Sequence, residues 1–150
     1  MSVLADLERR SDLPTKDLTV KWVIVIDRDL PRGIQANAAA CLAASVGVAV
    51  PAIVGSGGAD ATGLAHAGLP WTGCSVLGAP AAIVGRIRDD ATAEPELVVS
   101  DMIDIARRAG AYDDYLAELA RTEEPSYLAV SLFGPRAIVE RLTGRLPLLR

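Results

Sequence analysis

The sequence predicts an α/β domain in which helices cover both faces of a small mixed sheet. Two observations point to this class: stretches rich in β-branched residues alternate with stretches of helical periodicity, and glycine or proline marks most of the changes between them. With 150 residues, 51% of them hydrophobic, the chain can bury a core without disulfides or a structural metal. We expect a single domain at residues 20–150, preceded by an N-terminal extension at residues 1–19.

The first half of the chain contains the clearest strand and the clearest helix. Segment 20–27 (VKWVIVID) is a nearly continuous run of Val, Ile and Trp, which favours a central strand that is covered on both faces. A turn at 29–33 leads into an alanine-rich helix at 35–50, which Pro51 ends. Segment 55–73 contains six glycines and a proline, and we expect it to be a long loop.

Shorter elements follow this loop. We expect a strand at 75–79 and then a short helix whose first residue is Pro80. A third strand, at the edge of the sheet, is expected at 96–100. Apolar residues at helical spacing predict helix over 101–121, with Gly110 separating two helical pieces. The acidic residues of this segment favour a solvated outer face.

The end of the chain has the sharpest boundaries. Segment 126–133 alternates as a strand does, and Gly134-Pro135 is expected to turn it into a helix at 136–143. Gly144 is well placed to end that helix. The apolar tail at 146–149 should then dock on the body of the protein or on a partner.

Charge is distributed unevenly, and this limits the classes of partner. Between Gly33 and Gly85 the only formal charge is Asp60, whereas segment 89–124 holds eleven acids and three bases. The net charge is −4 and only 4% of residues are aromatic, whereas nucleic-acid binders combine a basic stripe with aromatic platforms. We therefore do not expect a nucleic-acid partner. Four C-terminal arginines can still form a small local patch: Arg136, Arg141, Arg145 and Arg150.

The cysteines and the uncharged stretch bear on compartment and cofactors. Cys41 and Cys74 are too few for a disulfide framework and lie in no metal-ligand spacing, so we expect a cytoplasmic protein without a metal. No P-loop, GxGxxG or GxSxG motif is present, and no cofactor is expected. The N-terminus lacks the apolar segment of a secretory signal. Uncharged residues 33–59 are mostly alanine and glycine, which favours a buried helix and loop over a membrane span.

Three blocks of the sequence carry a family resemblance. Residues 21–30 (KWVIVIDRDL) with the alanine-rich helix, and residues 132–149, resemble the opening and the end of the peptidyl-tRNA hydrolase II family. The combination of DLPRGIQANAAACLA, HAGL at 66–69 and YLAVSLFGPRAIVERLTGRLPLL is more closely similar to a bacterial relative, the domain of unknown function 2000 family. The resemblance covers nearly the whole chain from Lys21 onward. It implies a three-layer α/β/α sandwich on a four-stranded mixed sheet, and a homodimer.

Little of the hydrolase chemistry is implied by this resemblance. The family's strand lysine is matched by Lys21 and its following aspartate by Asp29. Acidic segment 101–121 replaces the family's polar turn between its last two strands. Hydrolysis of an ester on a tRNA needs cationic groups that bind the phosphates and hydrogen-bond donors that stabilise an oxyanion. This chain lacks most of the family residues that supply them, so we expect a cavity without positively charged donors. Four family positions, two turn lysines and a helix glutamine and histidine, are occupied here by Ile34, Ala36, Ala40 and Ala43.

A polar cluster follows the first strand, at the edge where α/β sheets usually bind ligands. Its members are Asp27, Asp29, Arg32, Gln35 and Asn37. Structural roles are open as well: Asp29 can cap the helix, the strand lysine can pair with an acid, and Asn37 can bond the loop backbone. As a group, Asp27, Arg32, Gln35 and Asn37 are candidate contacts for a small-molecule ligand.

His66 is the only histidine, and it lies in the glycine-rich loop. A lone histidine cannot build a metal site, but it can act as a general base or contact a ligand. Pairing with Cys41 is conceivable, although the apolar mid-helix surroundings of Cys41 favour a small buried thiol.

Three functions remain open from the sequence. The favoured one is a cytoplasmic binding or structural homodimer that keeps the hydrolase fold without its chemistry. The second is a hydrolase of an unidentified ester or amide that uses Lys21 and Asp29, with or without His66. A residual peptidyl-tRNA hydrolase ranks last. The uncharged stretch and the leucine tail are the features that favour self-association.

Overall fold

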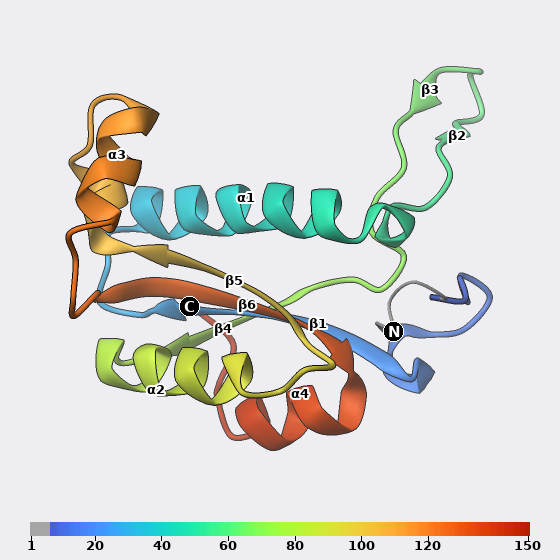
Figure 1. Ribbon diagram of the computed structural model, residues 1–150. Helices are drawn as coiled ribbons and strands as arrows, with labels where there is room; N and C mark the ends of the chain where they lie inside the picture. Colours follow the sequence, from blue (N-terminus) through green and yellow to red (C-terminus); the bar gives the residue numbers. More distant parts are fainter. Residues whose placement is uncertain (1–6) are drawn as a thin grey trace.

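The computed structural model describes residues 7–150 and consists of a four-stranded sheet between two layers of helices (Figure 1). The strand order is β4-β1-β6-β5. β1 pairs in parallel with β4 and antiparallel with β6, and β5 is antiparallel to β6. The predicted α/β class and four-stranded mixed sheet are therefore confirmed. The strands are β1 (Val20–Asp27), β4 (Ser75–Ala79), β5 (Val98–Ile103) and β6 (Tyr127–Pro135).

Helices cover both faces of this sheet. One face packs against α1 (Arg32–Ala49), and the opposite face packs against α2 (Ala81–Thr92) and α4 (Arg136–Thr143) (Figure 1). Alternation along β1 supplies both cores, because Trp22 and Ile24 face α1 whereas Val23 faces α2 and α4. The fully apolar run of β1 is thus explained by burial on both sides, as its composition predicted.

The boundaries of the helices in the first half differ from expectation by a few residues. α1 begins at Arg32, three residues earlier than expected, and its N-cap residue is Pro31. Pro80 caps α2 from outside, so that helix begins at Ala81 rather than at Pro80. In both cases proline is the N-cap residue and the helix begins at the residue that follows it.

The prediction of helix over 101–121 is wrong at its start. β5 runs to Ile103, because Met102 pairs with Ala129 of β6 and this sheet contact overrides the helical spacing of the side chains. Only α3 (Tyr112–Leu119) and the short 3-10 helix η3 (Asp104–Arg107) are helical in that segment. β6 also continues through the expected turn at Gly134-Pro135, where Pro135 is the last strand residue and lies opposite Val20.

Segment 55–73, expected to be a loop, contains a small hairpin. Its strands are β2 (Gly58–Ala59) and β3 (Ala65–His66), and the hairpin projects from the body beyond the end of α1 (Figure 1). The turn is held by Asp60, whose carboxylate accepts hydrogen bonds from the backbone N–H of Thr62 (2.8 Å) and the Thr62 hydroxyl (2.6 Å). A side-chain turn of this kind gives a glycine-rich segment local order.

The C-terminal tail docks on the protein's own sheet. The N–H of Leu149 donates to the carbonyl of Val76 (3.0 Å), and the N–H of Gly78 donates to the carbonyl of Pro147 (3.0 Å). The tail thereby covers the exposed edge of β4, which is one of the two outcomes expected for it.

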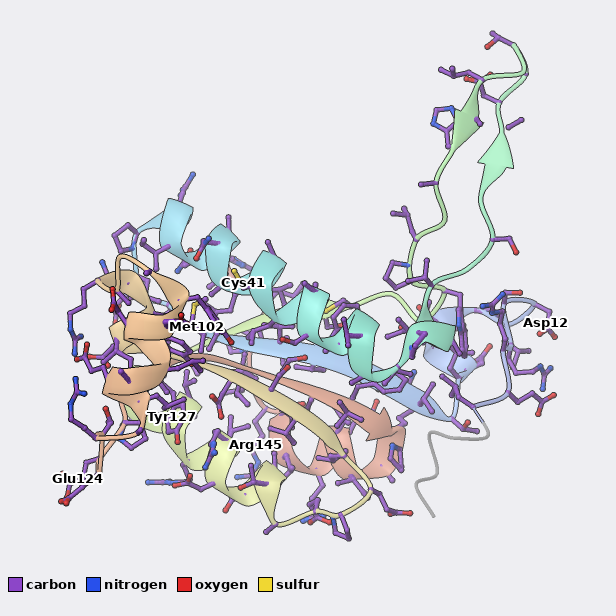
Figure 2. The ribbon with its side chains drawn as sticks, turned by 45° about the horizontal axis from the view of Figure 1, so that its top comes forward. Asp12, Cys41, Met102, Glu124, Tyr127 and Arg145 are labelled. Carbon is purple, nitrogen blue, oxygen red and sulfur yellow. The ribbon has the colours of Figure 1, made fainter. Side chains whose placement is uncertain are left out.

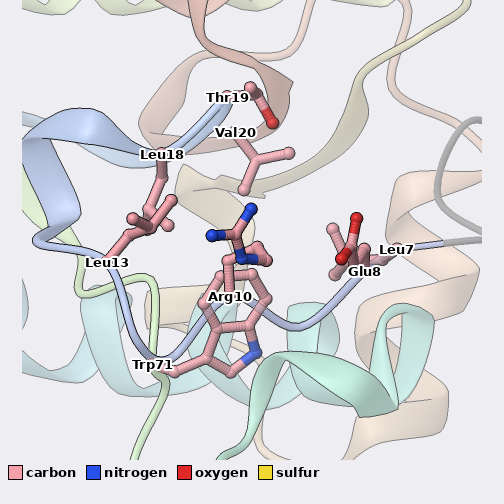
Figure 3. Close-up of a pocket in the computed structure, with 8 residues that line it drawn as sticks. All are labelled: Leu7, Glu8, Arg10, Leu13, Leu18, Thr19, Val20 and Trp71. Carbon is pink, nitrogen blue, oxygen red and sulfur yellow. The ribbon is translucent and has the colours of Figure 1, made fainter.

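The segment before β1 also packs on the body. Leu18 is buried in the α1-side core, and a short 3-10 helix, η1 (Thr15–Asp17), precedes it. Leu13, Arg10 and Trp71 lie around a cavity of about 260 Å³ beside the start of β1 (Figure 3). The Arg10 guanidinium forms an ion pair with Asp12 (2.8 Å), so its charge is already matched. Within residues 7–150, each helix is too short or too polar to cross a membrane.

Candidate functional site

The predicted site residues are separated along β1. Lys21 lies at the amino end of this strand and Asp27 at its carboxyl end, six residues further on and therefore ~20 Å away. Lys21 Nζ pairs with the carboxylate of Glu140 on α4 (3.3 Å), which is the structural role considered for it. Lys21 and Asp29 consequently do not converge on one reaction centre.

Two predicted residues shape the loop after β1. Gln35 is buried, and its side-chain amide donates to the backbone carbonyls of Asp27 (3.2 Å) and Arg28 (3.3 Å). The carboxylate of Asp27 accepts the N–H of Asp29 (2.9 Å). No side chain caps α1, so Asp29 does not have the capping role considered for it. Gln35 and Asp27 fix the loop and leave the side chains of Arg28 and Asp29 free.

Those two side chains line a cavity of about 430 Å³, which we name the Asp29 cavity. Arg150 completes the charged part of its wall, and residues 147–149 with Gly78 form the remainder. Within residues 7–150, the side chains of Arg28, Asp29 and Arg150 form no ion pair or hydrogen bond, although other charged groups of the chain do. The cavity therefore combines three charged side chains that have no partner among the described residues with the apolar side chains of Leu148 and Leu149, and its volume falls within the usual range of small-molecule sites.

The expectation of a cavity stripped of positive donors is wrong here. Arg28, which precedes Asp29 in the sequence, lines the cavity although it is not among the predicted site residues. Arg150, one of the four C-terminal arginines, reaches the same cavity because the tail docks on β4. The charged side chains of this wall are thus two guanidinium groups and one carboxylate. Guanidinium groups bind carboxylates and phosphates, whereas a carboxylate accepts hydrogen bonds from ammonium, amide or hydroxyl groups.

Asn37 and Cys41 belong to a different cleft. They lie on α1 and line, with Met102, Tyr112 and Tyr115, a space of about 370 Å³ next to α3. Figure 2 labels two of these residues, Cys41 on α1 and Met102 on β5. Cys41 is exposed, which contradicts the expected buried thiol, because the surface of α1 that carries it faces this cleft instead of the sheet.

Arg32 is exposed in the first turn of α1, and within residues 7–150 it has no ion-pair partner. Neither Arg32 nor Asn37 lines the Asp29 cavity. Of the four candidate ligand contacts, Asp27 and Gln35 support that cavity by holding its loop.

His66 lies on the projecting hairpin. Its Nε2 is 3.1 Å from the carboxylate of Asp60, and no hydrogen bond joins it to Cys41. Hydrogen bonds from the Thr62 hydroxyl and from His66 lower the pKa of Asp60 to about 2. His66, Lys21 and Asp29 thus occupy three different parts of the molecule. In the region from Leu7 to Arg150, no group of three or more His, Cys, Asp or Glu side chains is placed to hold a metal ion.

Comparison with known proteins places this geometry in a family. A family model described as "Protein of unknown function (DUF2000)" matches residues 20–150. Among solved structures, the chain is similar to the protein of unknown function Atu0240 from Agrobacterium tumefaciens strain C58, with a TM-score of 0.79 and 17% identity over 87% of this chain and 98% of that chain. At this identity the similarity shows a shared fold. The curated proteins contain no match to the chain.

Proposed function

The chain belongs to the DUF2000 family of proteins of unknown function. From the residues of the chain itself, we propose that it binds a small molecule in the Asp29 cavity. The observation that carries this proposal is the set of three uncommitted charges, Arg28, Asp29 and Arg150, around one cavity. The cavity lies at the carboxyl ends of the parallel strands β1 and β4. Open α/β sheets bind their ligands at that edge.

The lining favours a small zwitterion with an apolar group. A carboxylate of the ligand would lie against Arg28 or Arg150, and an ammonium group against Asp29. Leu148 and Leu149 would contact an apolar side chain. An amino acid of the leucine type or a short peptide combines these groups at a size that fits a cavity of about 430 Å³.

The residues at the positions of the hydrolase family's functional side chains favour binding over tRNA hydrolysis. We propose that the fold is related to the peptidyl-tRNA hydrolase II fold but lacks its chemistry. Ala36 and Ala40 expose methyl groups on α1 where the hydrolase family carries a cationic and a polar side chain. Lys21, the matched lysine, is paired with Glu140 at the far end of β1 from Asp29. Next to Asp29, the cationic groups available to hold a tRNA phosphate are thus the two arginines that line the cavity, Arg28 and Arg150.

Calorimetric titration tests the binding proposal. L-leucine should bind, whereas L-leucinamide, which lacks the carboxylate, and 4-methylpentanoate, which lacks the ammonium group, should each bind about tenfold more weakly or not at all. Arg28→Gln and Arg150→Gln should each weaken L-leucine binding by a similar factor. Arg86→Gln, at an exposed arginine outside the cavity, is the matched control and should change nothing. L-leucine binding that is unaffected by both cavity variants would contradict the proposal.

We also propose that the protein is a cytoplasmic homodimer. The largest exposed apolar side chains of the uncharged stretch are Val48 (82% exposed), Leu64 (62%) and Leu69 (77%), at the end of α1 and on the hairpin. An isolated two-stranded hairpin is marginally stable in water, so a second copy that covers it would stabilise it. Only Asp60 carries a formal charge in this stretch, so two copies can meet without strong repulsion. Both cysteines are exposed and free, which supports a reducing compartment.

Leu64→Asp combined with Leu69→Asp is expected to convert the dimer to monomer, because each subunit would bury two carboxylates in an apolar contact. Light scattering at micromolar concentration measures the change. Leu116→Asp, on α3, is the control and should leave the dimer intact. A monomeric native protein, or a double variant that stays dimeric, would rule out this interface.

A further inference from the structure

A second cavity lies at the opposite edge of the sheet, at the amino ends of β1 and β4. Its volume is about 410 Å³. Four segments meet there: η1, the start of β1, residues 72–75 and the start of α4. Among residues 7–150, the cationic residues that line it are Lys16, Lys21 and Arg136, and none of the lining residues is acidic. Lys16 and Lys21 are the only lysines in the sequence, so both lysines of the chain line this one cavity.

The charge of this cavity, which we name the lysine cavity, is only partly matched. Glu140 accepts from Arg136 Nη1 (2.9 Å) and pairs with Lys21 Nζ (3.3 Å), so one carboxylate serves two cations. Arg136 and then Lys21 lower the pKa of Glu140, which is consistent with this crowding of positive charge. Within residues 7–150, Lys16 has no ion-pair partner. Three cations and one carboxylate leave +2 at this cavity, although the whole chain carries −4.

The side chain of Arg136 is held by several hydrogen bonds, whereas that of Lys16 forms none within residues 7–150 and that of Lys21 bonds only Glu140 there. The Nε of Arg136 donates to the carbonyl of Leu18 (2.7 Å) and its Nη2 to the carbonyl of Thr15 (2.5 Å), which ties α4 to the segment before β1. Lys16 is exposed and the Lys21 side chain is 28% exposed, so their ammonium groups can turn toward a ligand. Lysine ammonium groups bind phosphate as point charges that need no fixed fork geometry.

Polar groups that suit an oxyanion complete the wall. Thr15 and Ser75 line the cavity, and the hydroxyl of neither residue forms a hydrogen bond within residues 7–150. The turn before β4 brings Gly73 to the same wall with a φ of +62°, a conformation that glycine adopts without strain. Two lysines and two hydroxyl-bearing residues can therefore surround a tetrahedral anion from several sides.

We propose that the lysine cavity binds a small phosphate oxyanion, either inorganic phosphate or the phosphate of a small phosphomonoester. A dianion would match the local charge of +2, and the cavity leaves space for a small organic group beyond the phosphate. Lys16 and Lys21 contact the anion, and Arg136 adds its field while holding the wall. Because this site uses no residue of the Asp29 cavity, it does not depend on the function proposed above.

The two lysines make a selective experiment possible. Reductive methylation with ¹³C-formaldehyde labels Lys16, Lys21 and the N-terminal amine and keeps their charges, so NMR can follow both lysines separately. Titration with inorganic phosphate and with glycerol 3-phosphate, against sodium chloride at equal ionic strength, should give saturable shifts of both lysine signals. A larger response to one of the two ligands identifies the source of the phosphate group. Shifts that follow ionic strength alone would overturn the proposal, as would saturation by a short oligonucleotide without response to either small phosphate.

The phosphate affinity of substituted proteins distinguishes a binding role of Lys16 from a structural one. Amide shifts of the unmethylated protein should show Lys16→Gln weakening phosphate binding about tenfold, and Lys16 is exposed and unpaired, so this variant should fold. Glu140→Gln should tighten binding, because it releases both partners of the carboxylate. Arg145→Gln, at an exposed arginine outside the cavity, is the control. Equal phosphate affinity in the native protein, Lys16→Gln and Glu140→Gln would contradict the assignment.

Discussion

Phe133→Ala is expected to lower the free energy of unfolding by about 3–5 kcal/mol. Phe133 is fully buried in β6, at the centre of the sheet, where it pairs with Trp22 of β1 and packs in the core beneath α1. The neighbouring ring of Trp22 is held by a hydrogen bond from its Nε1 to Ser131 Oγ (2.8 Å), which keeps it from moving into the cavity that the variant would leave. The surrounding small aliphatic side chains can close it only in part.

Urea unfolding followed by circular dichroism measures this loss. Tyr112→Ala is the matched aromatic control: Tyr112 is 72% exposed on α3, outside the proposed dimer contact, and its truncation should change stability by no more than about 1 kcal/mol. A loss below about 1 kcal/mol for Phe133→Ala would mean that the core under α1 is not packed as described.

Gln35→Leu is expected to lower the free energy of unfolding by about 1–3 kcal/mol and to weaken binding in the Asp29 cavity. Among the described residues, the side chain of Gln35 supplies the only hydrogen bond to the carbonyl of Arg28. Leucine fills a similar volume but leaves this carbonyl without a partner. The loop that carries Arg28 and Asp29 would then be free to move, which separates the two charges that the ligand needs.

Two variants show whether the hydrogen bond is responsible. Asn37→Ala changes an exposed amide of the same helix and should leave stability and binding nearly unchanged. Gln35→Glu places a carboxylate against two carbonyls, so its pKa in the folded state should rise above its unfolded value. That variant should therefore be more stable in acid and lose stability as the pH rises through the folded pKa, because the protonated form alone can donate. A pH-independent Gln35→Glu would contradict this role.

Elements with strong local signals were predicted accurately. β4 and α4 have the expected bounds because each combines a clear apolar pattern with a glycine or proline boundary, and β1 has them because its apolar run is bounded by the polar residues Thr19 and Arg28. Local signals failed where a distant partner decides the conformation. Met102 fits a helical pattern, yet it lies in β5 because β6 pairs with it. The hairpin at Gly58–His66 depends on side-chain contacts of Asp60 that composition does not reveal.

The site could be predicted only in part, for the same reason. Asp29 follows from its position after a central strand, and the cavity lies where α/β sheets place ligands. Arg150 reaches that cavity only because the tail pairs with β4, a contact between distant parts of the chain. Lys21 resembled a catalytic residue in sequence, but a strand keeps its two ends apart, and Lys21 therefore belongs to the lysine cavity.

A crystal structure of the complex with L-leucine tests directly whether the Asp29 cavity is the binding site. We expect the carboxylate of L-leucine within hydrogen-bonding distance of Arg28 or Arg150, its ammonium group on Asp29, and its side chain against Leu148 and Leu149. Electron density for the amino acid in the cleft beside Cys41, or at the lysine cavity with the Asp29 cavity empty, would contradict this expectation.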